Sequence, residues 1–224
     1  MVPAGLCRAW LDHPAIQLKT GSAVACVEAV ASGWQVLGND GAVLAEADAV
    51  VLANARDALD LVPDPPWPLS TVRGQITQLP PGCLPAIRRV IAREGYVAPG
   101  GGRLLVGATY EHDDDDDDTA PRTASDMANL ARLEAILPGA GKHLGAGEVT
   151  GRASLRATLP DRLPIVGAVS GQPGLFVAAG YASRGVVWAG LLGEALADLM
   201  TQQPLPLEAD LMQAIAPARY SQKT

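Results

Sequence analysis

Aromatic residues and cysteines are scarce in this sequence of 224 residues. Aromatics make up 4% of it, Phe176 is the single phenylalanine, and the three cysteines, Cys7, Cys26 and Cys83, lie far apart. An odd number of cysteines without a CxxC motif argues against a disulfide framework and against a zinc site. This usage favours a reducing, cytoplasmic setting. Because aromatics are few, we expect Ala, Val and Leu to form most of the core.

The sequence also lacks a long apolar run and an excess of basic residues. The longest apolar stretch, 186–199, contains Glu194 and Asp198, so we expect no membrane span. The net charge is −7, but six of the 24 acidic residues form one run, Asp113–Asp118, without which acids and bases nearly balance. The acidity is therefore local, and the sequence lacks the broad basic footprint of a protein that binds nucleic acid by charge alone.

Several motifs of nucleotide binding and catalysis are missing as well. Gly139 and Gly141 begin a GxGxxG pattern, but Leu144 stands where its third glycine belongs. There is no P-loop and no HExxH, and Ser183 misses the GxSxG nucleophile elbow by one residue. The aspartate run could offer oxygen ligands to a divalent cation. Adjacent carboxylates repel one another and do not enclose an ion, so we expect a solvated loop there and no metal site.

Punctuation by proline and glycine divides the sequence into three segments. Four prolines between 61 and 69 form a stiff connector, and we expect segments at 1–62, 63–150 and 151–224. Gly38-Asn-Asp-Gly41 indicates a hairpin in the first segment. The middle segment is expected to hold an antiparallel sheet and one helix, capped by Thr123 or Ser125 and ending near Leu137. Its expected strands cover 71–79, 88–92, 96–98 and 103–111, and a further strand is expected at 147–157.

Two local patterns indicate possible sites. Residues 174–179 form a buried strand, followed by a turn with Gly180 and Gly185 and a helix to about Met200. Small residues at such a turn let a ligand approach the backbone, and the helix start favours negative charge, although a purely structural joint would have the same sequence. The second pattern is a strand that ends at Arg156, ahead of Pro160 and Pro164. An arginine there can clamp a carboxylate through two hydrogen bonds or form a surface salt bridge.

Taken together, these segments resemble the FAD-dependent amine oxidoreductases of the D-amino-acid-oxidase and glycine-oxidase type. The resemblance extends over nearly the whole chain, and the closing residues 204–220 resemble a subgroup that modifies tRNA. The matching motifs are Asp48–Ala55, Val72–Gln75, Gly95–Pro99, Leu105–Glu111, Leu155–Arg156 with Asp161–Gly167, and Gly180–Gly185.

The resemblance implies an α/β (α+β) fold: part of a Rossmann-like FAD-binding domain, formed by the first and last segments, plus an antiparallel-sheet substrate domain of the D-amino-acid-oxidase type. It also implies that this chain lacks the strand–GxGxxG–helix start of the FAD domain and the methyltransferase half of the bifunctional tRNA-modifying subgroup. A chain without that start could be a non-catalytic fragment unable to retain FAD. Arg88, Arg89, Arg93, Arg152 and Arg162 could form a modest tRNA-facing patch, or they could be scattered surface arginines.

The resemblance further implies a reaction and its site residues. The substrate would be a 5-carboxymethylaminomethyl group on a tRNA wobble uridine, oxidised beside its amine to an imine that hydrolyses to glyoxylate and the aminomethyl group. Arg156 would bind the substrate carboxylate with help from Tyr96. The implied cofactor-binding residues are Ser183, Arg184, Gly185, Val186, Val24, Ala53, Asn54, Ala55 and Arg73. The alternative substrate is a small free amino acid: glycine, sarcosine or a D-amino acid.

Overall fold

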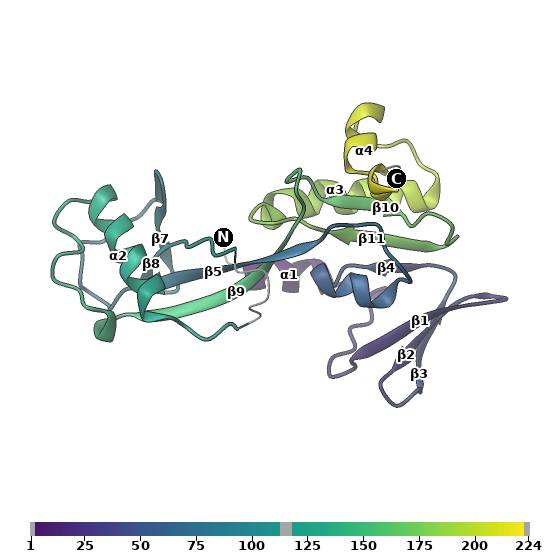
Figure 1. Ribbon diagram of the computed structural model, residues 1–224, viewed down its shortest axis with the longest axis horizontal. Helices are drawn as coiled ribbons and strands as arrows, with labels where there is room; N and C mark the ends of the chain where they lie inside the picture. The colour runs from purple at the N-terminus through teal and green to yellow at the C-terminus, as the bar shows by residue number, and fades with distance from the viewer. Residues whose placement is uncertain (1–2, 113–117, 222–224) are drawn as a thin grey trace. The chain divides into compact units, whose positions relative to one another are not determined.

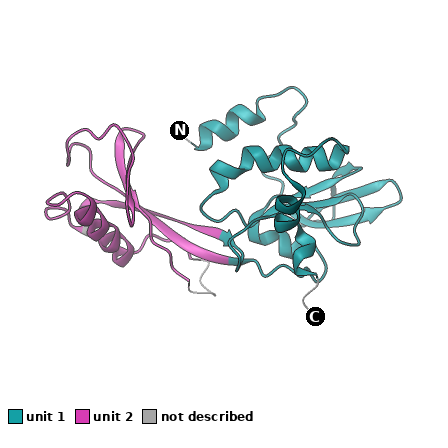
Figure 2. Cartoon of the chain, turned by 90° about the horizontal axis from the view of Figure 1, so that it is seen from above, with its two compact units in different colours: residues 1–70, 157–224 teal, residues 71–156 magenta. Residues whose placement is uncertain are grey.

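The computed structural model describes residues 3–112 and 118–221, and the chain divides into two compact units. Unit 1 consists of residues 1–70 with 157–224, and unit 2 of residues 71–156 (Figure 2). The chain enters unit 2 within strand β5 (Ser70–Gln78) and leaves it within β9 (Thr150–Thr158). The segment limits expected from the sequence, 62/63 and 150/151, precede the 70/71 and 156/157 limits of these units.

Unit 1 contains two three-stranded sheets with helices (Figure 1). The first is an antiparallel meander of β1 (Val24–Val30), β2 (Gly33–Gly38) and β3 (Val43–Ala47). Gly38 N–H donates to Ala42 O in its second turn, as the hairpin prediction required. The second sheet has the order β10-β11-β4. Its strands are β10 (Ile165–Ala168), β11 (Leu175–Ala179) and β4 (Val50–Leu52).

Two apolar clusters form the core of unit 1. The larger packs around Trp34, Leu52 and Val177, and the indole Nε1 of Trp34 donates to Pro173 O over 3.0 Å. The smaller packs Val166 against Leu192 and Leu196 of a long helix. As expected from the composition, Val and Leu predominate in both. The helical elements are α1 (Pro3–Leu11), η1 (Ala55–Leu61), α3 (Gly185–Thr201), α4 (Ala209–Ile215) and η3 (Pro217–Tyr220).

Unit 2 is built on the five-stranded sheet β6-β7-β8-β5-β9, with helix α2 (Thr123–Ile136) packed on β7 and β8. Leu79, Val97, Val106 and Leu133 are its most deeply buried apolar residues. The remaining elements are β6 (Ile91–Ala92), β7 (Tyr96–Gly100), β8 (Arg103–Gly107) and η2 (Ala146–Glu148).

The expected side-chain cap of α2 is absent. Arg122 occupies the N-cap position and makes no side-chain capping hydrogen bond. The hydroxyl of Ser125 instead donates to Glu111 Oε1 over 2.6 Å. Because the helix begins at Thr123, Ser125 is its third residue and not its N-cap, and its hydroxyl bonds to a residue outside the helix. Of the aspartate run, residues 113–117 lie outside the described residues.

Within the described residues, no helix is long and apolar enough to cross a membrane. In the same part of the chain, no group of three or more His, Cys, Asp or Glu side chains is arranged to hold a metal ion.

Candidate functional site

Two parallel strands of unit 1 end at the same edge of their sheet. β4 pairs with β11 in parallel, with Val50 opposite Leu175 and Leu52 opposite Val177. The loops that follow them, Ala53–Ala55 and Gly180–Arg184, therefore both leave from the carboxyl end of the sheet. In open sheets with parallel strands, ligands bind beyond this edge. The structure thus brings together two segments, far apart in the sequence, that the resemblance had selected as cofactor-binding.

The second loop leads directly into α3, a helix of 17 residues. The first N–H groups of a helix have no acceptor within it, and its N-terminal end carries partial positive charge. Ser183 and Arg184 before this start are exposed, Gly185 is half-buried, and Val186 is exposed. With no acidic residue in the first turn, the helix start can receive an anionic or electron-rich edge of a ligand.

Arg184 folds back along its own helix. Its guanidinium carbon lies 5.1 Å from the centroid of the Trp188 ring, one turn further along, and Nη1 donates to Arg162 O over 3.4 Å. The cation–π contact and the carbonyl contact hold the side chain against the surface of unit 1. The Arg184 side chain is therefore engaged with Trp188 and Arg162.

Two of the expected cofactor-binding residues lie elsewhere. Val24 is the first residue of β1, in the other sheet of unit 1, and the residue is 42% exposed. Arg73 belongs to unit 2 and is buried. Its guanidinium donates to Glu111, Gln75 and the carbonyls of Asp118 and Ala120. Those bonds occupy four of the five N–H donors of an arginine. The expected contact between Arg73 and the cofactor stays a prediction, and little of the side chain is available for it.

The network around Arg73 includes much of the buried polar surface between the sheet and α2. Glu111 accepts from Arg73, Arg122, Ser125 and Thr109. Burial raises the pKa of the Glu111 carboxyl, but hydrogen bonds from Ser125 and Thr109 and the charge of Arg73 outweigh burial, and the net pKa is lowered. Sequence analysis identified Arg73 but missed this role, which depends on strand register.

The opposite face of the same strands carries Arg156 and two tyrosines. Arg73 pairs with Glu111 as a β-bridge, so by strand alternation Gly74 and Tyr110 share the other face. The Arg156 guanidinium carbon lies 4.4 Å from the centroid of the Tyr110 ring, and Nη1 donates to Thr109 O over 3.3 Å. Within the described residues, Arg156 has no carboxylate partner, so a half-buried cation remains available to an external anion.

Tyr96 belongs to the same cluster. It stands opposite Gly107 in the β7–β8 pairing, and a Cβ added at Gly107 would lie 3.0 Å from the Tyr96 hydroxyl. Burial raises the pKa of Tyr96, while the nearby charge of Arg156 lowers it and Tyr110 raises it; the net pKa is raised. Tyr96 therefore stays protonated at neutral pH and can donate a hydrogen bond. Sequence analysis selected Arg156 and Tyr96 but missed Tyr110 and Gly74, although both lie in motifs that it identified.

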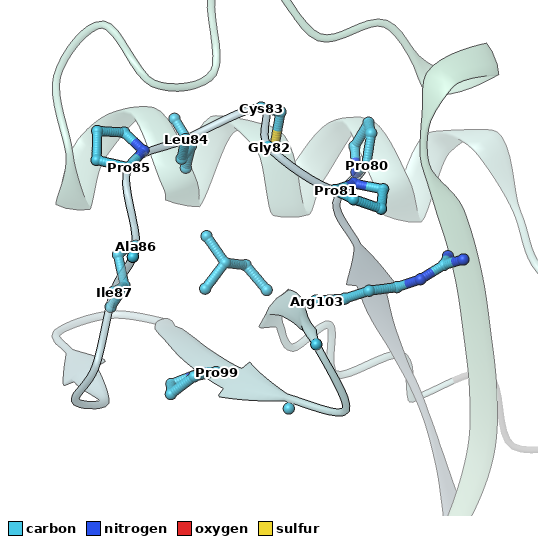
Figure 3. A pocket seen from close by; sticks show the side chains of 13 residues that line it. Pro80, Pro81, Gly82, Cys83, Leu84, Pro85, Ala86, Ile87, Pro99 and Arg103 are labelled. Atoms are coloured by element: carbon cyan, nitrogen blue, oxygen red, sulfur yellow. The ribbon is translucent and has the colours of Figure 1, made fainter.

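Unit 2 also contains a hollow of about 330 Å³, which is not lined by Arg156, Tyr96 or Tyr110. Proline rings and aliphatic side chains line most of it, with Cys83 and Arg103 at its sides (Figure 3). Burial is the largest influence on the Cys83 thiol and raises its pKa. The hollow therefore presents neither a reactive thiolate nor a set of converging polar groups, and we do not assign the site to it.

The comparison with known families agrees with two features of the structure. One is the parallel-strand edge with a helix start in unit 1, and the other is the arginine–tyrosine cluster on the sheet of unit 2. Residues 3–199 match the family described as FAD dependent oxidoreductase (DAO), and the chain belongs to this family. The family prediction, the fold class and FAD as the family's cofactor are thereby confirmed.

The most informative relatives are bifunctional proteins. The chain is 72% identical to the tRNA 5-methylaminomethyl-2-thiouridine biosynthesis bifunctional protein MnmC of Thiobacillus denitrificans (strain ATCC 25259 / T1), over 99% of this chain and 36% of that protein. It is 39% identical to the protein of the same name from Burkholderia vietnamiensis (strain G4 / LMG 22486), over 97% of this chain and 37% of that protein. The chain thus spans little more than a third of the length of these relatives.

Solved structures support the fold. Glycine oxidase from Geobacillus kaustophilus superposes with a TM-score of 0.70 at 24% identity, covering 88% of this chain and 52% of that one. L-proline dehydrogenase from P. horikoshii gives a TM-score of 0.74 at 20% identity, covering 92% of this chain and 56% of that one. At these identities the likeness establishes the fold alone.

Proposed function

We propose that this chain contributes to an FAD-dependent oxidation of a secondary amine that bears a carboxymethyl group, on a uridine of tRNA. The observation that carries the proposal is Arg156: a half-buried guanidinium beside two tyrosines, with no carboxylate partner in the described part of the chain. A cation held in this way favours a carboxylate ligand, because partly buried charge is stabilised by an opposite charge. Identity of 72% with the protein from Thiobacillus denitrificans supports tRNA as the carrier of that group.

The residues of unit 1 fit part of an FAD site. Ala53–Ala55 are exposed and Ser183–Val186 are exposed or half-buried, and both segments follow the carboxyl ends of adjacent parallel strands. We propose that they contact FAD, with the helix start of α3 providing N–H groups and positive potential to an electron-rich part of the cofactor. Val24 and Arg73 remain weaker candidates for the same role. When bound, FAD supplies the acceptor for the two electrons removed from the substrate.

The residues of unit 2 would bind and orient the substrate. Arg156 would hold the carboxylate through parallel hydrogen bonds, and the Tyr96 hydroxyl would donate to the same group or to the adjacent amine. Removal of two electrons and two protons from the N–CH2 unit gives an imine. Addition of water then releases glyoxylate and leaves the aminomethyl group on the uridine. In this scheme the chain's own residues position the reacting carbon and supply no covalent catalyst.

Partners and location follow from the same proposal. The remaining length of the relatives would supply the rest of the FAD site and a second activity. A tRNA-modifying role implies a cytoplasmic protein. The exposed arginines 88, 89 and 93 of unit 2 are candidates for contact with the tRNA backbone.

A second candidate is the oxidation of a small free amino acid. An arginine that binds a carboxylate would serve glycine or sarcosine equally well, so Arg156 alone does not separate the two substrates. The relatives favour tRNA, and comparing turnover of tRNA that carries the carboxymethylaminomethyl group with turnover of free glycine and sarcosine decides between them.

The test uses the full-length polypeptide that carries this sequence. We expect Arg156→Gln to lower kcat/KM for the modified tRNA by about tenfold or more, since a hydrogen bond to a charged group contributes about 1.5–3 kcal/mol. Flavin content, measured by absorbance, should be unchanged. Arg103→Gln removes an exposed arginine of the same sheet and serves as the control. Unchanged kinetics for Arg156→Gln would exclude this residue as the carboxylate ligand.

A further inference from the structure

The guanidinium of Arg156 lies directly against the backbone of Gly74. Gly74 is buried in the middle of β5, and β9, which carries Arg156, is the neighbouring strand. A Cβ built at position 74 would overlap Nη1, Cζ and Nη2 of Arg156. The whole planar end group therefore occupies the space that any side chain at position 74 would fill. The glycine is needed there for this close approach.

Tyr110 supplies a second surface for the same group. Its ring centroid lies 4.4 Å from the Arg156 guanidinium carbon, which is a cation–π distance. Tyr110 is half-exposed, so its ring lies between the Arg156 guanidinium and the solvent on one side of the cluster. Thr109 O, one residue earlier, accepts the hydrogen bond from Nη1. The carbonyl of Thr109 accepts from one guanidinium N–H group, and the ring of Tyr110 covers the guanidinium. Together they hold the guanidinium in place.

The register of the sheet sets this arrangement. The Arg73–Glu111 bridge and the hydrogen bond from Thr109 N–H to Gln75 O align residues 109–111 with residues 73–75 of β5. Alternation then directs Gly74 and Tyr110 to the face opposite the buried network. Because the guanidinium is planar, a fixed orientation determines where its remaining N–H donors point. Arg156 is less free to swing than an exposed arginine.

We propose that Gly74 and Tyr110 are positioning residues that hold the Arg156 guanidinium and thereby determine the preference of the site for a carboxylate. The inference rests on the proposed function of Arg156 as the carboxylate ligand. Gly74 acts by leaving space and Tyr110 by stacking, and neither needs to touch the substrate. A methyl group at position 74 would push the guanidinium off the sheet, and loss of the ring would let it rotate.

The experiment measures carboxylate binding in the full-length, FAD-loaded polypeptide. The probe is glycolate. Its binding is measured by calorimetry and, separately, by competitive inhibition of turnover. Ethylene glycol, which carries no charge, is the comparison compound. We expect Gly74→Ala and Tyr110→Ala each to weaken glycolate binding by about tenfold, as for a charge-assisted hydrogen bond lost from a fixed geometry. Tyr110→Phe keeps the ring and should bind glycolate as the unaltered protein does.

Gly147→Ala is the matched control for the glycine, because Gly147 is exposed in the same unit and a Cβ there meets nothing within 4 Å. The double variant Gly74→Ala/Arg156→Gln separates positioning from a general structural effect. If Gly74 acts through Arg156, the double variant binds glycolate no more weakly than Arg156→Gln alone. An additional tenfold loss in the double variant would instead give Gly74 an independent structural role and overturn the inference for it.

The remaining outcomes distinguish this inference from the proposed function. If Arg156→Gln weakens glycolate binding while Gly74→Ala and Tyr110→Ala do not, the positioning inference is wrong and the proposed function of Arg156 stands. If Arg156→Gln leaves glycolate binding unchanged, the proposed function itself fails. Tyr110 is half-exposed, so its alanine variant tests the inference even if Gly74→Ala does not fold.

Discussion

The guanidinium of Arg73 is paired with the carboxylate of Glu111, with 2.9 Å between Nη1 and Oε2, and the Arg73 side chain is only 2% exposed. The pair joins β5 to the segment after β8, and the same two residues form a β-bridge. Further hydrogen bonds from Arg73 reach the carbonyls of Asp118 and Ala120. The charged pair thus lies on one face at the register that places Gly74 and Tyr110 together on the opposite face.

Breaking this pair should destabilise unit 2 strongly. We expect Glu111→Gln to lower the free energy of unfolding by about 3 kcal/mol, because it leaves a buried guanidinium without its counter-charge. Urea denaturation measures the change. The comparison is Lys142→Met, which removes an exposed partner lying 4.0 Å from Glu134; solvent screens an exposed pair of this kind, so we expect a much smaller loss. Equal losses in the two variants would contradict the role given to Arg73 and Glu111.

The same carboxylate predicts a dependence on pH. The pKa of Glu111 in the folded chain lies below its ordinary value of 4.5. Burial raises this pKa, but the hydrogen bonds from Ser125 and Thr109 and the charge of Arg73 lower it by more than burial raises it. Its contribution to stability is therefore complete above the unfolded pKa and is lost as pH falls through the folded pKa. We expect the stability difference between the unaltered chain and Glu111→Gln to shrink as the pH falls below 4.5, the ordinary pKa of the carboxyl. A constant difference over that range would contradict the lowered pKa.

A side chain at Gly180, in the turn between β11 and α3, should destabilise unit 1. This residue has φ of +75°, and an added Cβ would lie 2.7 Å from Leu159 Cδ1. Gly171 also has φ of +75°, but a Cβ there meets nothing within 4 Å. We expect Gly180→Ala to cost about 1–3 kcal/mol more than Gly171→Ala, since both pay for the left-handed backbone and only Gly180 adds overpacking. Chemical denaturation checks this, and equal costs would mean that Leu159 yields freely.

The C-terminal segment is attached to unit 1 through Asp161 and Arg219. Arg219 Nε and Nη2 donate to the two carboxylate oxygens of Asp161 over 2.8 and 3.2 Å, and Nη2 also donates to Leu163 O. We expect Asp161→Asn to weaken this attachment by about 1–2 kcal/mol. Amide hydrogen exchange should then accelerate in residues 218–220 while β11 stays protected. Exchange at the original rate in 218–220 would show that the ion pair does not hold the segment.

Much of the fold could be predicted from residue patterns because it depends on local chemistry. The Gly38–Gly41 turn predicted the β2–β3 hairpin, and the apolar run 48–54 predicted the strand observed as β4. Residues 174–200 gave the strand–turn–helix observed as β11 and α3. The expected cap of α2 was wrong: the helix begins at Thr123 with Arg122 at its N-cap, and the hydroxyl of Ser125 bonds to Glu111, whose proximity no local pattern reveals.

The site depended on both levels. The sequence by itself determined the elements, the family resemblance and the choice of Arg156, Tyr96 and the loops after two buried strands. Only the tertiary structure decided that β4 and β11 are parallel neighbours, that Arg73 is engaged internally, and that Gly74 makes room for Arg156. The physical reason is that alternation along a strand assigns residues to one of two faces, whereas strand order and register, which decide what meets on a face, are set by long-range pairing.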